Sequence, residues 1–485
     1  MQYHSTRSLS PGVDSARAVL QGLAPDGGLF VPERLPRLDT KAMLSGSVQD
    51  VACRVLTALL PDIPGMAQLV HRAYDGKFDA PDLTPTVQAG PFTVLELFHG
   101  PTSAFKDVAL CMLPQLLTAA REAVGSQREI RILTATSGDT GKAALEGFRD
   151  VPGVSICVFY PAGGVSAVQR AQMVTQQGKN VAVSAVRGNF DDAQTGVKHI
   201  FAACRDMALP FDLSSANSIN IGRLAPQVTY YYKAYRDLCD RGQIKYGDQV
   251  NFAVPTGNFG DILAGFLAKQ MGLPVGRLIC ASNANRVLTD FIRTGTYDRR
   301  RPLHKTQSPS MDILVSSNLE RLLYLLTGDC DQVAAYMKLL EEQGFYTVSP
   351  ALLKSIRSGF WAGCCDDSTA RAVICRVWQD CHYLCDPHTA AGWAAAEAYQ
   401  AETGDSRPLV VLSTASPYKF PAAVLQALGQ EGQGDDFARM ACLERLTGLP
   451  VPRNLQGLQQ LPELHGSIIE KAEMQAFSLN FRTKE

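Results

Sequence analysis

Lys106 lies in a sequence context that favours a reactive amine. It follows the segment HGPTSAF (residues 99–105), in which Pro101 and Thr102 are predicted to open a helix. The lysine then falls in the first turn of that helix, although a cation is favoured at the opposite end. Apolar neighbours such as Phe105 predict a desolvated amine with a lowered pKa. Such an amine suits Schiff-base chemistry with an aldehyde.

Three turns rich in Gly, Ser or Thr follow segments that are predicted to be strands. TSGDTG (136–141) precedes a helix predicted to begin near Lys142, and PTGNFGD (255–261) precedes a helical pattern that runs through Met271. STASP (413–417) follows the last of these apolar segments. A helix N-terminus presents unpaired N–H groups and a positive dipole to an anion, and hydroxyls add further donors. These turns therefore predict sites for a phosphate and a carboxylate.

The first two turns do not match nucleotide-binding motifs. A triphosphate-binding loop needs Gly at position 136 and Ser or Thr at position 143, where this chain has Thr136 and Ala143. The turn at 255–261 lacks the G-x-G-x-x-G spacing of a dinucleotide fingerprint. A desolvated lysine beside two anion cups is instead what a pyridoxal-phosphate enzyme requires. The lysine holds the aldehyde, one cup holds the cofactor phosphate, and the other holds an amino-acid carboxylate.

The elements that position these residues alternate between strands and helices from about residue 91 onward. Several of the strand segments are nearly continuous apolar runs, which is typical of parallel sheets covered on both faces. Residues 315–400 are predicted to be mostly helical, and helices are also expected near 40–60 and 66–76. The predicted strands are 129–135, 155–160, 180–186, 250–254, 277–282 and 408–413.

The composition of the 485 residues is that of an ordinary globular protein. Lys and Arg number 46 against 47 Asp and Glu, so the net charge of −1 predicts neither nucleic-acid nor membrane binding. The thirteen cysteines are scattered, and the cluster from Cys364 to Cys385 lacks paired metal-ligand spacing, so no metal is predicted. Cysteines within apolar runs, such as Cys157, and the lack of an apolar leader predict a cytoplasmic protein.

Six ordered motifs resemble those of the threonine synthase family. They are HGPTSAFKD (99–107), TSGDTG (136–141), NSIN followed by GRL (217–224), PTGNFGD (255–261), DPHTA (386–390) and STASPYKFP (413–421). The N-terminal segments YHSTRS (3–8) and APDGGLFVPE (24–33) also resemble the start of the longer, microbial form of that enzyme. The resemblance covers nearly the whole chain, and six motifs in the right order are far more specific than any one alone.

The resemblance implies a fold-type II pyridoxal-phosphate enzyme of the α/β class. Such an enzyme has two lobes with open parallel or mixed sheets and the cofactor between them, here with an N-terminal accessory layer and a helical C-terminal part. It is expected to work as a monomer or homodimer. The expected divisions are an accessory segment (1–90), a large lobe (91–110 and 226–430), a small mobile lobe (111–225) and a helical tail (431–485).

The resemblance also implies roles for individual residues. Lys106 forms the Schiff base with the cofactor and then moves protons on the substrate. The other expected cofactor contacts are Asp139, Gly257, Asn258, Phe259, Gly260 and Thr414, of which Thr414 meets the pyridine nitrogen and Asp139 lies near the phenolic oxygen. The expected carboxylate contacts are Ser137, Gly138, Thr140 and Gly141. The candidates for the substrate phosphate are Ser166, Arg170, Asn217, Asn220 and Arg223.

The implied reaction converts O-phospho-L-homoserine and water to L-threonine and phosphate, by γ-elimination and β-addition of water. One segment departs from the commoner pattern, because Ser416, Pro417 and Tyr418 stand where His and Ala usually precede the Lys-Phe pair. If that His orders the attacking water, a phospho-lyase that releases 2-oxobutyrate is the alternative. A non-catalytic homologue that binds pyridoxal phosphate is another. A β-replacement synthase fits less well, because of the long N-terminal segment and the GNFGD form of the second turn.

Overall fold

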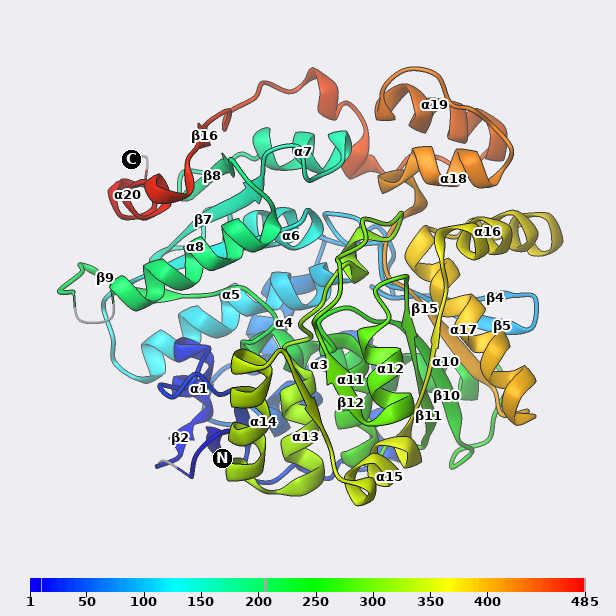
Figure 1. Cartoon of the computed structure of the whole chain (residues 1–485), viewed down its shortest axis with the longest axis horizontal. Helices are drawn as coiled ribbons and strands as arrows, with labels where there is room; N and C mark the ends of the chain where they lie inside the picture. Colours follow the sequence, from blue (N-terminus) through cyan, green and yellow to red (C-terminus); the bar gives the residue numbers. More distant parts are fainter. Residues whose placement is uncertain (10, 205–206, 484–485) are drawn as a thin grey trace.

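Two large sheets and the helix between them organise the chain (Figure 1). The computed structural model describes residues 1–9, 11–204 and 207–483. Helix α5 (Lys106–Ala123) follows a strand of the larger sheet and precedes a strand of the smaller one. No helix in the described part of the chain has the length and apolar character that a membrane crossing needs.

The larger sheet has six strands in the order β14-β11-β10-β15-β5-β4, and all but β4 run parallel. Helix α17 covers one face, while α11, α12 and α15 pack on the other side. The strands are β4 Thr86–Ala89, β5 Phe92–Glu96, β10 Val250–Pro255, β11 Val275–Ser282, β14 Phe360–Cys364 and β15 Leu409–Ser413.

The smaller sheet has five parallel strands in the order β16-β8-β7-β6-β9. Helix α8 packs against β6 and β7, and α6 packs against β7. The strands are β6 Glu129–Ala135, β7 Val154–Pro161, β8 Val181–Val186, β9 Phe211–Ser214 and β16 Ile468–Ile469.

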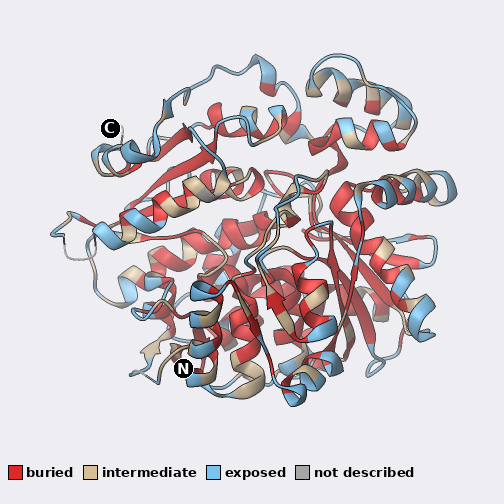
Figure 2. Ribbon diagram, in the orientation of Figure 1, coloured by how far each residue is buried: buried red, intermediate tan, exposed pale blue. Residues whose placement is uncertain are grey.

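The central strands are buried on both faces (Figure 2). In β11, Leu278 and Cys280 join one apolar cluster while Ile279 and Ala281 join another. Successive side chains of a strand point to opposite faces, so a strand between two apolar layers needs a continuous apolar run. This is why the sequence shows runs rather than alternation in these strands.

The helices account for most of the remaining ordered chain. They are α1 Ser15–Gln21, α2 Thr40–Met43, α3 Val48–Leu59, α4 Met66–Tyr74, α6 Asp139–Phe148, α7 Ala167–Val174, α8 Phe190–Ala203, α9 Ile221–Leu224, α10 Val228–Asp240, α11 Gly260–Gln270, α12 Val287–Thr294, α13 Leu319–Thr327, α14 Cys330–Glu342, α15 Pro350–Gly359, α16 Asp367–Cys381, α17 Pro387–Thr403, α18 Pro421–Ala427, α19 Asp436–Thr447 and α20 Met474–Asn480.

The N-terminal segment packs against α5 and α10. Its antiparallel sheet has the order β2-β1-β3, with β1 Gln2–Ser5, β2 Val13–Asp14 and β3 Phe30–Pro32. The Tyr74 hydroxyl at the end of α4 donates to the Val108 carbonyl of α5 at 2.9 Å. Strand β4 lies within the segment expected to be accessory, yet it pairs with β5 of the larger sheet. The larger sheet therefore begins before the expected boundary at residue 91.

The C-terminal segment joins the two sheets rather than forming a purely helical tail. Helix α18 packs on α16 and α19, and the chain then crosses to the smaller sheet, where β16 pairs with β8 (Figure 1). On the way, the amide of Leu464 donates to the Val174 carbonyl at 2.7 Å. Of the expected 431–485 tail, the last two residues lie outside the described part of the chain.

All six predicted strands are present, with bounds that differ by at most two residues. The prediction that Pro101 and Thr102 open a helix is wrong, because residues 101–105 form a turn and α5 begins at Lys106. The helix predicted near Lys142 begins at Asp139. Strands β4, β5, β9, β14 and β16 were not predicted, because each has five or fewer residues and is defined mainly by its partner. Strand β14 also interrupts the stretch expected to be mostly helical.

A close contact between α5 and α6 fixes the distance between the two loops that precede these helices. A Cβ on Gly147 of α6 would lie 2.0 Å from the carbonyl oxygen of Leu110 in α5, so only glycine allows the observed approach. We expect Gly147→Ala to lower the free energy of unfolding by about 1–3 kcal/mol, the range for overpacked cores. Urea unfolding followed by circular dichroism measures this loss.

Gly359→Ala is the matched control, because Gly359 is also a helical glycine but a Cβ there meets nothing within 4 Å. Its stability should be unchanged or slightly raised. Equal losses in the two variants would show that the contact with Leu110 does not control the packing of α6.

Candidate active site

The loops predicted to do chemistry lie at the carboxyl ends of neighbouring parallel strands. In the larger sheet β10, β15 and β5 are adjacent, and they end in the turn at 255–261, Thr414 and the loop to Lys106. In the smaller sheet β7, β6 and β9 are adjacent, and they end in the loops that hold Ser166, residues 136–141 and Asn217. Open parallel sheets bind ligands at this edge. The two edges meet where Lys106 lies 3.8 Å from Asp139.

Lys106 is nine-tenths buried at the N-terminus of α5. Its Nζ lies 3.8 Å from Asp139 Oδ2 and donates to Ser310 Oγ at 3.4 Å. Burial lowers the pKa of this amine to about 8, against an opposing effect of the Asp139 carboxylate, while Lys419 and Arg223 lower it further. The amine is therefore neutral far more often at neutral pH than an exposed lysine is.

The loop before Lys106 is tied to the end of β15. The amide of Phe105 donates to the Thr414 carbonyl at 2.9 Å, and the amide of Ser416 donates to the Ser103 carbonyl at 3.1 Å. Ser103 has a φ of +58°, a left-handed conformation that non-glycine residues seldom adopt. These bonds hold Lys106 close to Thr414, which is itself buried and whose hydroxyl bonds to no group in the described chain.

The turn at 136–141 is organised by Thr136. Its hydroxyl accepts hydrogen bonds from the amides of Gly138 and Gly141, at 3.0 and 2.8 Å. The hydroxyls of Ser137 and Thr140 are half-buried and bond to nothing within residues 1–9, 11–204 and 207–483. Gly138 has a φ of +140°, and a Cβ there would lie 2.5 Å from the Gln169 side chain. The turn thus leaves two hydroxyls available to an anion, as a carboxylate cup requires.

Asp139 lies between two lysines at the start of α6. Its Oδ1 accepts from Lys419 at 2.6 Å and from Gln169 at 2.8 Å, and its Oδ2 faces Lys106. Burial alone would raise the pKa of this carboxyl, but the ammonium groups of Lys419 and Lys106 outweigh it and hold the pKa well below its usual range. Asp139 is therefore a buried carboxylate that stays ionised.

The turn at 255–261 has the geometry of a phosphate cup. Phe259 has a φ of +62° and is the N-cap of α11. The carbonyls of Gly257 and Asn258 accept from Ser316 Oγ and the Asn318 amide, at 2.8 and 3.1 Å, whereas the N–H groups of residues 257–259 donate to nothing within the described residues. A Cβ on Gly257 would lie 2.5 Å from the Ser310 carbonyl. Three consecutive free amides at a helix N-terminus suit an oxyanion.

Asp261, at the end of this turn, was not among the predicted site residues. Its Oδ1 accepts from the hydroxyls of Tyr230 and Tyr231 at 2.6 and 3.0 Å, and its Oδ2 is buried with no partner in the described chain. Burial raises the pKa of this carboxyl to about 6. The two tyrosines therefore hold the first turn of α11 through this carboxylate.

The five candidates for a second phosphate site differ sharply in their surroundings. Arg170 is half exposed and forms an ion pair with Glu463 at 2.6 Å. Both polar atoms of the Asn220 amide are occupied, by the Val19 carbonyl and the Gly222 amide. Ser166 caps α7, although its neighbour Gln169 reaches Asp139. These three residues have structural roles.

Arg223 and Asn217 retain free polar groups. Arg223 is buried, its Nη1 donates to the Ala216 carbonyl at 2.7 Å, and its Nε has no hydrogen-bond partner among the described residues. It forms no ion pair within that part of the chain, and burial lowers its pKa to about 10. The Oδ1 of Asn217 is also buried and unpaired there. A buried guanidinium without a carboxylate partner indicates a site for an external anion.

Three further residues complete the surroundings of Lys106. Lys419 and His388 lie in two of the motifs named above, but neither was given a role. Ser310 carried no signal at all. The Ser310 amide donates to His388 Nε2 at 3.1 Å, and His388 Nδ1 lies 2.5 Å from Asp386. Asp386 also caps α17, so the chain Asp386–His388–Ser310 supports the wall of the site from a fixed helix.

Tyr418 and Ser416, two of the residues that depart from the family pattern, have hydrogen-bond partners outside Lys106. The Tyr418 hydroxyl donates to the Leu449 carbonyl beyond α19, and its ring joins the apolar cluster around α18 and α19. The Ser416 hydroxyl accepts from the Tyr418 amide and caps the short helix η3 (Pro417–Lys419). This short helix nevertheless brings Lys419 to Asp139.

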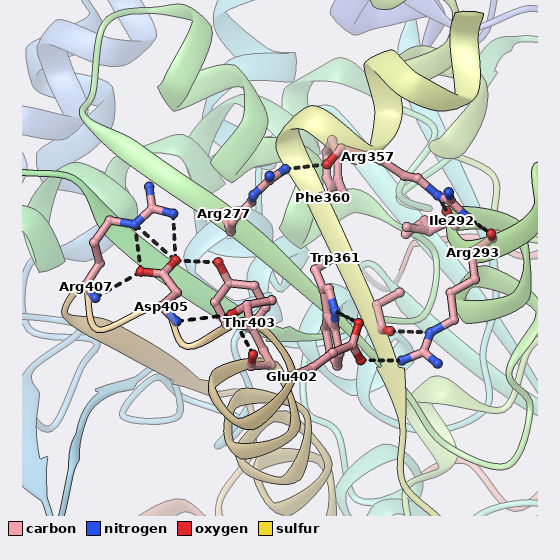
Figure 3. Close-up of a pocket in the computed structure, with 12 residues that line it drawn as sticks. Arg277, Ile292, Arg293, Arg357, Phe360, Trp361, Glu402, Thr403, Asp405 and Arg407 are labelled. Carbon is pink, nitrogen blue, oxygen red and sulfur yellow. Dashed lines mark hydrogen bonds and ion pairs between the residues drawn. The ribbon is translucent and has the colours of Figure 1, made fainter. Parts of the chain in front are cut away.

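A cavity of about 640 Å³ lies at the opposite, amino-terminal edge of the larger sheet (Figure 3). Four arginines line it, but each is bonded to a neighbour: Arg407 to Asp405, Arg293 to Glu402, and Arg277 and Arg357 to backbone carbonyls. The Trp361 indole also donates to Glu402 at 3.1 Å. The cations of this cavity hold the sheet edge together, and the site for chemistry is the edge that holds Lys106.

The residues around Lys106 fit pyridoxal phosphate. The free amides of residues 257–259 suit its phosphate, the unpaired Thr414 hydroxyl suits its ring nitrogen, and the buried amine of Lys106 suits its aldehyde. A site of this composition between two open parallel sheets defines a pyridoxal-phosphate-dependent enzyme.

Comparisons with known proteins narrow this class. The family model for pyridoxal-phosphate-dependent enzymes matches residues 78–415, and those for the threonine synthase N terminus and C-terminal part match 2–74 and 389–476. Threonine synthase of Pseudomonas aeruginosa is 40% identical, over 96% of this chain and 99% of that protein. The pyridoxal-phosphate-bound threonine synthase of Brucella melitensis has a TM-score of 0.87 and 38% identity, with 99% of each chain covered. The chain belongs to the threonine synthase family.

Human threonine synthase-like 1 is also similar, with 37% identity over 95% of this chain. The chain spans 62% of the length of that relative. The family match confirms the expected fold-type II architecture and the expected cofactor.

The lowered pKa of Lys106 predicts how the apoprotein captures its cofactor. Only a neutral amine attacks an aldehyde, so below a pKa of about 8 the capture rate should fall about tenfold for each pH unit, and above it the rate should level off. Absorbance-detected mixing of full-length apoprotein with pyridoxal phosphate from pH 6.5 to 9.5 measures this dependence. Lys106→Ala should show no covalent capture. A midpoint near 10.5, the ordinary value for lysine, would contradict the burial of the amine.

Proposed function

We propose that this protein converts O-phospho-L-homoserine and water to L-threonine and phosphate. The observation that supports this substrate most strongly is Arg223, a buried guanidinium with an unpaired Nε near Lys106. The cofactor phosphate and a substrate carboxylate have cups of their own at 257–260 and 137–141. Arg223 therefore supplies a third anion site, as an amino acid that carries a phosphate group requires.

The cofactor contacts divide between the two sheets. Bound pyridoxal phosphate supplies an electron sink that acidifies hydrogens on the substrate carbons near the amino group. Gly257, Asn258, Phe259 and Gly260 would hold its phosphate through backbone amides. The Thr414 hydroxyl would donate to the ring nitrogen, and a hydroxyl there would leave the ring neutral. Asp139 would lie near its phenolic oxygen.

The substrate carboxylate is assigned to the cup of Ser137, Gly138, Thr140 and Gly141. The free hydroxyls of Ser137 and Thr140 are its donors, because the amides of Gly138 and Gly141 bond to Thr136. The phosphate group of the substrate binds Arg223, with Asn217 alongside. The cup belongs to the smaller sheet, so we treat residues 111–225 as a small mobile lobe that closes on the lobe formed by 91–110 and 226–430. Closure of this kind excludes bulk water from the reacting carbons.

Lys106 moves the protons of the reaction. Its neutral amine removes the proton from Cα, and one proton is then lost from Cβ as the phosphate leaves Cγ. Cγ gains a proton, and a water molecule gives its hydroxyl to Cβ and its remaining proton to the site. Cα then regains a proton, and the last proton leaves with the phosphate. The sum adds one water and releases one phosphate. Arg223 neutralises the charge that develops on the leaving phosphate, which is where electrostatic stabilisation is most effective.

The working unit is proposed to be a monomer or homodimer in the cytoplasm. Buried thiols such as Cys157 and Cys280 lie in apolar strands, as reduced cysteines of cytoplasmic proteins do.

The test is to incubate the loaded protein with O-phospho-L-homoserine and identify the organic product together with released phosphate. We expect L-threonine in equal amount to phosphate. Because Tyr418 is bonded to Leu449 rather than turned toward Lys106, the departure at 416–418 should not prevent hydration at Cβ. Phosphate with 2-oxobutyrate and ammonia would make the protein a phospho-lyase, and no phosphate would indicate a non-catalytic homologue.

Arg223→Met should raise the KM for O-phospho-L-homoserine by about 100-fold, the value of a charge-assisted hydrogen bond to phosphate. Binding of L-threonine, which lacks the phosphate, should change little, as measured by perturbation of cofactor absorbance. Arg236→Met is the matched control, because Arg236 is also buried and donates to a backbone carbonyl, that of Gly46, but lies outside the site. An equal rise in both variants would remove Arg223 from the phosphate site.

A further inference from the structure

A second lysine shares the carboxylate that faces Lys106. Lys419 is fully buried at the end of η3, after β15. Its Nζ lies 2.6 Å from Asp139 Oδ1 and donates to the Thr102 carbonyl at 3.0 Å. Lys106 lies farther from the same carboxylate, 3.8 Å from Oδ2.

We propose that Lys419 is a positioning residue whose buried ammonium takes the charge of Asp139, so that Lys106 has no counter-ion of its own. This inference rests on the proposed role of Lys106 as the cofactor-bearing amine, but it does not depend on which amino acid is the substrate.

The charge balance of the site supports this role. One carboxylate, Asp139, faces two ammonium groups, and the shorter contact is with Lys419. Both buried lysines contact this one carboxylate, and the Asp107 carboxylate raises the pKa of Lys106 by less than Lys419 or Arg223 lowers it. The system lowers its energy if one amine loses its proton. Lys106 is that amine, because burial lowers its pKa to about 8 and both Lys419 and Arg223 add to the effect.

The other ionisable groups near Lys106 are occupied by neutral or separate partners. Asp107 accepts from the Thr102 amide and hydroxyl, and burial raises its pKa to about 6. Asp261 is held by Tyr230 and Tyr231. His388 pairs with Asp386 and accepts from the Ser310 amide. Asp139 is therefore the carboxylate that Lys106 and Lys419 share.

Lys419 also links three separate segments. Its own helix follows β15, Thr102 belongs to the loop before Lys106, and Asp139 begins α6 of the smaller sheet. An apolar residue of similar length would keep the packing but would break both polar contacts. A charged residue would keep the charge balance. The role of the charge can thus be separated from the role of the volume.

The test is a pH titration of the absorbance of bound pyridoxal phosphate in full-length wild type, Lys419→Met and Lys419→Arg. In Lys419→Met, Asp139 becomes the counter-ion of the nitrogen at Lys106, so the absorbance midpoint should rise by about one pH unit or more. In Lys419→Arg the positive charge remains, and the midpoint should stay within about 0.3 units of wild type. Lys233→Met controls for the loss of a buried lysine, because Lys233 pairs with Asp237 outside the site.

A midpoint that is unchanged in Lys419→Met, or that moves equally in Lys419→Arg, would overturn the proposal. If Lys419→Met does not fold, Asp139→Asn provides the second test, because loss of the carboxylate should lower the midpoint. An unchanged midpoint in Asp139→Asn would also overturn it. No substrate is present in these titrations, so a protein that shows the shift but makes no threonine would contradict the proposed function alone.

Discussion

The burial of one amine between the carboxyl ends of two parallel sheets is the constraint on which the structure depends. Lys106 is the first residue of α5 and faces Asp139 of the smaller sheet. The preceding residue, Phe105, donates its amide to the carbonyl of Thr414 at the end of β15. Burial of a charged lysine in this position is unfavourable in free energy. This penalty lowers the pKa of Lys106 to about 8. The fold bears that cost because α5 is buried on several sides by α1, α4, α6 and α9.

The anion sites follow from the same geometry. In each of the two turns some polar groups form hydrogen bonds within the protein while others stay free. The Thr136 hydroxyl accepts from two amides of the turn at 136–141, and Ser316 donates to the Gly257 carbonyl of the turn at 255–261. Unpaired amides and the left-handed residues Ser103 and Phe259 are individually unfavourable. They persist because the surrounding strands and helices fix both ends of each turn, and a bound anion satisfies the free donors.

The sequence predicted the strands and turns, because these features depend on local residue patterns. The six strands are apolar runs because they are covered on both faces, and the turns carry Gly, Ser and Thr because helix N-termini and anions require them. Arg170 and Arg223 could not be distinguished by type or spacing, since only the folded chain shows that one pairs with Glu463 and the other is buried unpaired. Ser310 and the contact of Lys419 with Asp139 depend on residues far apart in the chain, so no local pattern marks them.

The most direct test of the central claim is to find which amine carries the cofactor. The protein loaded with pyridoxal phosphate is reduced with borohydride, which fixes the lysine adduct, and the modified peptide is identified by mass spectrometry. Two buried lysines flank Asp139, so the result discriminates between them. The account predicts a phosphopyridoxyl group on Lys106 in stoichiometric amount. A label on Lys419, or one spread over exposed lysines, would contradict it.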